Sequence, residues 1–217
     1  LKICYHNNWI EKDLVIFYKG RFNEVNVNFL TDEELSSIRE KEFSGKGLEL
    51  VRDMFVFSCY TGLAYIDIFN LTKDQLSKGI DGNLWIITNR QKTGSTSNIP
   101  LLPVAEEIIK KYENHPVSSN SGKLLPVYTN QKVNEYLKTI AENCGINKKL
   151  TFHCARHTFA TTVTLGNNVS MESVSKMLGH KSIKTTQHYA KILDSKVSQD
   201  MGSLKLVLEK KNEVQKE

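Results

Sequence analysis

The sequence of 217 residues predicts a mainly α-helical fold with a small antiparallel β-hairpin. Most of the chain repeats its apolar residues at the spacing of an amphipathic helix, about 3.6 residues per turn. Residues 84–101 differ, because two short apolar and β-branched runs are separated there by a polar turn at 91–97. Hydrophobic residues make up 40% of the chain, which suits one large domain with short appendages.

The first helix is predicted to begin just after Thr31. The hydroxyl of Thr31 can cap the helix, and Glu34 stands where a capping box needs an acidic residue. Leu35 and Ile38 supply its apolar stripe. Residues 1–28 alternate aromatic and basic side chains without a sustained period.

Two further helices and the hairpin follow. Residues 48–60 form a more apolar helix, which we place at the centre of the core, and residues 63–71 form a third helix. The strands are predicted at 84–88 and 98–101.

The second half of the chain is predicted to be helical apart from a loop at 115–126. Proline suits the first position of a helix, and Pro103 stands at the start of one such segment. Helices are expected at 103–112, 127–144 and 152–165, from Ser170 to Gly179, and from Ser182 onward through Tyr189.

Composition narrows the class of protein only slightly. Lys and Arg outnumber Asp and Glu by 29 to 24, and the net charge of +5 modestly favours a polyanionic partner. No apolar run approaches the ~18 residues of a membrane-spanning helix, so we expect no membrane partner.

The cysteines are scattered without a CxxC pair, which is typical of free thiols in the cytoplasm. They are Cys4, Cys59, Cys144 and Cys154. The chain begins at Leu1, so we expect it to be part of a longer protein.

Two segments near the end of the chain concentrate reactive side chains. His153 and Arg156 are three residues apart and share one face of a helix. His180 and Tyr189 follow within the run 178–189. A guanidinium stays charged and can pair two phosphate oxygens at once. A phenol beside such a cation and several imidazoles can attack a phosphodiester without a metal ion.

With two other segments, these residues resemble the motifs of the tyrosine recombinases, the phage-integrase family. Residues 153–156 resemble its HxxR motif and residues 178–189 its LGH…Y motif. Residues 61–67 resemble TGLRxxE/D, and residues 92–94 fit its hairpin lysine. The motifs occur in the family's order, and the resemblance extends from about residue 28 to residue 201.

The resemblance implies the tyrosine recombinase catalytic-domain fold and a site-specific DNA recombinase. Tyr189 would attack the scissile phosphate and form a 3′-phosphotyrosyl bond, with no cofactor, metal ion or ATP. Arg156 would clamp the phosphate, His153 would handle protons beside it, and His180 would contact it. Lys92 would protonate the leaving 5′-oxygen.

The resemblance also implies partners and domains. We expect double-stranded DNA, a homo-oligomer that is a tetramer in the synapse, accessory DNA-bending proteins and a bacterial cytoplasmic location. Residues 1–28 would be a linker or the remnant of an upstream core-binding domain, and residues 29–203 the catalytic domain. Residues 204–217 would be a tail exchanged between protomers.

Ala64 departs from the family pattern, which has its first catalytic arginine at this position. Asp67 keeps the acidic place of the motif, so the register holds. The form TGLAYxD resembles integrases of Bacteroides-type mobile elements. Either another cation, Arg52 or Lys73, compensates, or the enzyme is slow or inactive.

Other interpretations stay open at this point. The chain could be a catalytically weakened DNA-binding relative, or an enzyme similar to a type IB topoisomerase, although the spacing to the tyrosine favours a recombinase. His180 could bind backbone carbonyls at a helix end, and Lys92 could be merely solvated. We expect His157 to be a structural histidine, although with His153 it has a spacing that could bind zinc.

Overall fold

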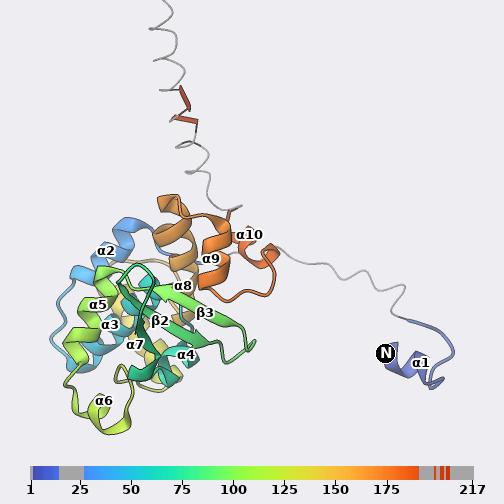
Figure 1. Cartoon of the computed structure of the whole chain (residues 1–217), viewed down its shortest axis with the longest axis horizontal. Helices are drawn as coiled ribbons and strands as arrows, with labels where there is room; N and C mark the ends of the chain where they lie inside the picture. Colours follow the sequence, from blue (N-terminus) through green and yellow to red (C-terminus); the bar gives the residue numbers. More distant parts are fainter. Residues whose placement is uncertain (1, 15–26, 191–197, 199–200, 203, 206–217) are drawn as a thin grey trace, which may run out of the picture.

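The computed structural model describes residues 2–14, 27–190, 198, 201–202 and 204–205. Within residues 27–190, helices surround a central helix and a small sheet lies on one side, so the predicted fold class is confirmed (Figure 1). In the described part of the chain, no helix is long and apolar enough to cross a bilayer.

The central helix is α3 (Lys46–Thr61), as its apolar sequence predicts. It is buried over most of its length and packs against α2 (Asp32–Glu40), α5 (Pro103–Tyr112), α7 (Asn130–Asn143) and α8 (Phe152–Thr158). Burial removes apolar surface from water, at about 25 cal/mol per Å², and this is the main force that holds the helices together.

Local signals set several helix ends. The capping box between Thr31 and Glu34 is present at the start of α2, and Pro103 opens α5. The helix α3 ends at Gly62, whose φ of 70° is easily adopted only without a side chain. A Cβ there would also lie 2.5 Å from the ring of Phe159, so the chain after α3 can approach the segment after α8 closely.

The sheet has three strands in the order β1-β2-β3, all antiparallel. The predicted hairpin corresponds to β2 (Leu84–Asn89) and β3 (Thr96–Pro100). Ile86 faces Ile99 across the two strands, and both are buried. The strand β1 (Leu76–Lys78) was not predicted, because three residues are too few to show an alternating pattern.

Two other predictions need correction. Residues 115–126 are not all loop, since α6 (Pro116–Ser121) lies within them. It begins with proline, ends at Gly122 and has no apolar stripe, so periodicity could not reveal it. The predicted helix 152–165 is divided into α8 and a π-helix η2 (Phe159–Thr164), followed by a 3₁₀ turn η3 (Leu165–Asn167). Threonine hydroxyls in this stretch bind backbone carbonyls, which favours an irregular helix.

A second, smaller core joins η2 to the last helices of the domain, α9 (Met171–Met177) and α10 (Lys184–Ala190). Its members are Phe159, Ala160, Leu165, Val174, Leu178 and Tyr189. The short elements α4 (Tyr65–Asn70) and η1 (Lys73–Gln75) complete the fold of residues 27–190, and α1 (Lys2–His6) lies in the predicted linker region.

The predicted tail lies largely outside the described residues. Leu204 is described and exposed, whereas Leu206, Val207 and Leu208 fall outside them. The same holds for residues 15–26 of the predicted linker. Both domain assignments therefore stay predictions.

Candidate active site

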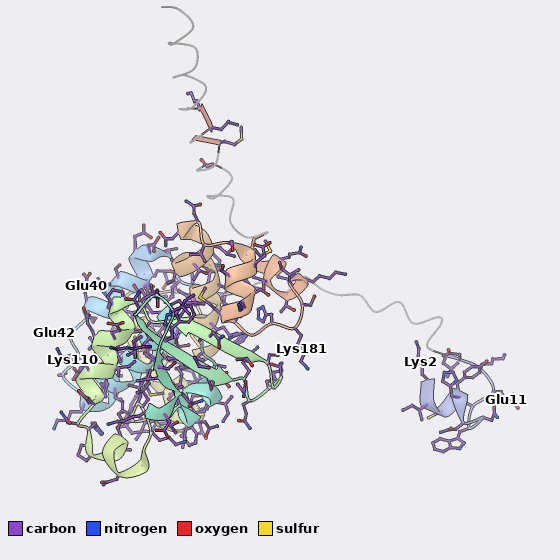
Figure 2. All side chains as sticks on the ribbon, in the orientation of Figure 1. Lys2, Glu11, Glu40, Glu42, Lys110 and Lys181 are labelled. Atoms are coloured by element: carbon purple, nitrogen blue, oxygen red, sulfur yellow. The ribbon has the colours of Figure 1, made fainter. Side chains whose placement is uncertain are left out.

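Three parts of the chain converge on one site: the turn after α3, the helix α8, and the segment from the end of α9 to α10. The helix α8 packs against α3, and α10 packs against both α9 and η2. Figure 2 shows Lys181, in the loop between α9 and α10, at the edge of the domain away from Glu40, Glu42 and Lys110.

Arg156 lies at the centre of this site and is buried. Its Nη1 donates to the carbonyl of Gly62 at 2.6 Å, and its Nη2 donates to the carbonyl of Leu178 at 2.6 Å. Burial, and then the charge of Arg90, lowers the pKa of Arg156 to about 10, so it is still a cation near neutral pH. One side chain thus connects the end of α3 to the end of α9.

His180 contacts the same guanidinium. Its Nε2 lies 3.1 Å from Nη2 of Arg156, and its Nδ1 lies 2.8 Å from Oγ1 of Thr186. Burial, with the charges of Arg156 and Arg90, lowers its pKa to about 4, so the ring is neutral near pH 7. Because arginine can only donate, Nε2 accepts and Nδ1–H donates to Thr186. Both ring nitrogens are therefore engaged, and His180 can contact a phosphate only by exchanging one of these bonds.

The hydroxyl of Tyr189 lies 3.0 Å from Nδ1 of His157. Burial raises the pKa of Tyr189, although the charges of Arg156 and Arg90 oppose this. The pKa of His157 is lowered to about 4, mainly by burial and then by His153 and Arg156. Near neutral pH a protonated phenol therefore faces a neutral imidazole, and the tautomer of His157 decides which of the two donates the hydrogen bond.

His157 is the residue of the site for which the sequence favoured a purely structural role. It contacts Tyr189 across two helices, and no local spacing in the sequence encodes that contact. Among the described residues, no three His, Cys, Asp or Glu side chains cluster as a metal site would require.

His153 lies on the outer side of this group. It is exposed, and its ring meets His157 edge to face, with centroids 4.3 Å apart. Partial burial and the charges of Arg156, Lys92 and Arg90 lower its pKa. Lys92, in the turn between β2 and β3, is exposed and is close enough to influence His153 electrostatically. The structure thus gathers Arg156, His153, His180 and Tyr189, with Lys92 at the margin.

Ala64 lies beside a hollow of about 400 Å³ that reaches His153 and Arg156. The two cations expected to compensate for Ala64 are elsewhere. Arg52 donates to Asp53 at 2.7 Å and to the carbonyl of Lys41, so it forms a structural ion pair. Lys73 binds the carbonyl of Glu113 at 3.3 Å. The hypothesis that Arg52 or Lys73 fills the gap is therefore wrong.

The sequence matches the model of the phage integrase family over residues 28–196. It is 29% identical over 170 residues to tyrosine recombinase XerC of Rickettsia canadensis (strain McKiel), covering 73% of this chain and 50% of the relative. Tyrosine recombinase XerD of Lacticaseibacillus casei is 30% identical over 172 residues, covering 74% of this chain and 57% of the relative. The chain thus spans about half the length of the curated relatives it matches.

Solved structures share the fold. The XerA recombinase superposes with a TM-score of 0.64 at 20% identity, covering 93% of this chain and 71% of that one. A lambda integrase (75–356) dimer bound to a COC' core site gives 0.65 at 19% identity, covering 87% and 68%. The fold is therefore that of a tyrosine recombinase catalytic domain. Since the family model covers most of the sequence, the chain belongs to the phage integrase family.

Proposed function

We propose that this chain is the catalytic part of a site-specific DNA recombinase that cleaves and rejoins strands through a 3′-phosphotyrosyl intermediate, without ATP or a metal ion. The observation that carries the proposal is the shared site of Tyr189 and Arg156, a buried phenol and a buried cation that each contact a neighbouring imidazole. The curated relatives XerC and XerD are tyrosine recombinases, which supports this chemistry.

In the proposed step, the phenolic oxygen of Tyr189 attacks the scissile phosphorus. A bond from this oxygen to phosphorus forms while the bond from phosphorus to the 5′-oxygen breaks. The phenolic proton passes to the neutral His157, whose Nδ1 is 3.0 Å away. The leaving 5′-oxygen takes a proton from Lys92, and the 5′-hydroxyl of a partner strand later attacks the phosphotyrosine in reverse.

Arg156 stabilises the negative charge that develops on the non-bridging oxygens. Three of its five N–H donors are engaged by Gly62, Leu178 and His180, which leaves two for a phosphate. A fixed donor of this kind typically stabilises the transition state by about 3 kcal/mol. We assign His180 to holding the guanidinium and contacting the phosphate, and His153 to proton handling at the outer side.

A nicked suicide substrate tests the proposal, because the cleaved strand diffuses away and the covalent adduct accumulates on a gel. The wild-type chain should form the adduct, and Tyr189→Phe should form none while binding DNA nearly as well. The substitution removes only the nucleophilic oxygen. An adduct with Tyr189→Phe would show that another residue is the nucleophile.

Two alternatives are distinguished by the fate of the cleaved strand. A recombinase joins it to a second duplex, whereas an enzyme similar to a type IB topoisomerase relaxes supercoiled DNA and rejoins the same strand. A DNA-binding relative that has lost cleavage gives no adduct at all. Ala64 lies beside His153 and Arg156, where the family pattern has an arginine. The adduct assay therefore also tests whether the chain still cleaves DNA without that arginine.

We further propose that the partner is double-stranded DNA at a recombination site and that the chain acts as a homo-oligomer, a tetramer in the synapse, with accessory DNA-bending proteins. Support comes from the neighbours, since XerH was solved with difH substrate and lambda integrase as a dimer on a core site. A bacterial cytoplasmic location and a relation to Bacteroides-type integrases belong to the same proposal.

A further inference from the structure

Arg90 is a largely covered arginine whose buried Nε has no hydrogen-bond partner among the described residues and only a long ion pair with Asp67. It follows β2 at the start of the turn to β3, and its side chain is only 10% exposed. The closest ion pair is with Asp67, where Nε lies 3.8 Å from Oδ2. This is too long for a hydrogen bond, and both atoms are buried without a hydrogen-bond partner among the described residues. Such burial of a cation is costly unless an anion completes its environment.

The backbone around Arg90 is well fixed. Its own N–H donates to the carbonyl of Ser95 at 2.9 Å, and its carbonyl accepts from Gly94 at 2.8 Å. The next residue, Gln91, donates its N–H to Oδ1 of Asp67 at 2.9 Å. Asp67 therefore anchors the turn through one oxygen, while its other oxygen only approaches the guanidinium.

The side chain of Arg90 runs directly against the segment that carries the catalytic imidazole. A Cβ at Gly179 would lie 2.7 Å from Cδ of Arg90, so the stem passes over this glycine, immediately before His180. Arg90 comes from a different element than Arg156 and approaches the site from the hairpin side.

The charges of the two arginines act on the same groups of the site. After burial, Arg90 is the largest cause of the lowered pKa of Arg156, and it also lowers the pKa of His180 and His153. Its charge also favours ionisation of Tyr189. A buried cation and a largely covered one that repel each other make a site that an anion would relieve.

We propose that Arg90 is a second guanidinium that binds the scissile phosphate, and that it supplies from the β2–β3 turn the charge that is absent at Ala64. This inference rests on the proposed function. As the phenolic oxygen bonds to phosphorus and the 5′-oxygen leaves, the charge on the two non-bridging oxygens is shared between Arg156 and Arg90. Planar guanidinium groups suit this task because each can pair two oxygens.

Single-turnover adduct formation on the suicide substrate tests this role. Arg90→Ala should slow cleavage about 10²- to 10³-fold, the usual loss for one fixed donor at a developing oxyanion. Arg90→Lys should lose less, because it keeps the charge but not the fork. The matched control is Arg52→Ala, which removes an arginine of α3 that is paired with Asp53 away from the site. It should cleave within a few-fold of the wild-type rate.

A second substrate separates phosphate binding from a structural role. A methylphosphonate at the scissile position replaces one charged oxygen by a methyl group and so reduces the need for a second cation. If Arg90 binds the phosphate, the defect of Arg90→Ala relative to wild type should shrink at least ten-fold on this substrate. Equal defects on both substrates would overturn the inference, as would wild-type cleavage by Arg90→Ala. If the wild-type chain itself forms no adduct, the proposed function fails instead.

Discussion

The two neutral imidazoles of the site should make the protein sensitive to mild acid. His157 and His180 each have a pKa of about 4 in the folded protein, against an ordinary value of 6.5. Above pH 6.5 both are neutral in the folded and unfolded states. Between pH 6.5 and about 4 the unfolded chain binds protons that the folded chain excludes, so stability falls as pH falls. Below about pH 4 both rings are protonated in both states, so they no longer change the free energy of unfolding.

The size of this effect follows from the same values. A fall from 6.5 to about 4 corresponds to roughly 3 kcal/mol for a fully shielded imidazole. Both rings are partly exposed, and solvent screening reduces this to about 1–2 kcal/mol each. The pair should therefore lower the free energy of unfolding by about 2–4 kcal/mol between neutral pH and about pH 4. The total free energy of unfolding of most proteins is only about 5–15 kcal/mol.

Urea denaturation at a series of pH values measures the effect directly. The double variant His157→Gln/His180→Gln keeps polar side chains but cannot titrate, so its stability should depend much less on pH in this window. His188→Gln is the matched control, because His188 is exposed on the same helix as Tyr189. A wild-type stability that stays level from pH 7 to about pH 4.5, or a double variant with the wild-type slope, would refute the reasoning.

Three further predictions concern the glycine turn, DNA binding and the tail. Gly179→Ala should cost more than about 2 kcal/mol of stability, because its φ is 59° and a Cβ would meet Ser97 and Arg90. Gly94→Ala, with a φ of 65° but open space around it, should cost only about 1 kcal/mol. Equal losses in thermal denaturation would contradict this. DNA binding by the chain alone should be weak and should fall steeply with salt through counterion release, so nanomolar site-specific binding at physiological salt in a titration would count against it. Truncation after Met201 should reduce paired cleavage in a synapsis assay if the tail is exchanged between protomers, and unchanged assembly would argue for a tail without that role.

The sequence predicted the elements whose signals are local. The capping box of Thr31, the proline that opens α5 and the β2–β3 hairpin are all encoded within a few residues, and the structure confirms them. The change to a π-helix after Thr158 was not predictable, since it depends on threonine hydroxyls competing for carbonyls within an otherwise helical pattern.

In the candidate site, too, local sequence signals were predictive and contacts between distant residues were not. The motif residues were recognisable from their spacing, and the structure brings most of them together. His157 and Arg90 were not recognised, because their contacts join positions far apart in the chain, to Tyr189 and to Gly179. Arg52 was a plausible substitute because it carries the same guanidinium fork, but its neighbours Asp53 and Lys41 already engage it.

The place of Tyr189 in the second core has a consequence for background reactivity. The ring that carries the proposed nucleophile is only 6% exposed and packs with Phe159, Val174 and Leu178. Withdrawing a large apolar side chain from such a cluster costs about 1.5–3 kcal/mol. Under the proposed function, a phosphodiester that Tyr189 could reach only by leaving this cluster would meet this cost in full, which would lower the rate of its cleavage by roughly 10- to 100-fold. If the proposed function holds, the packing that stabilises the fold would thus also restrain the nucleophile when no matching DNA site is bound.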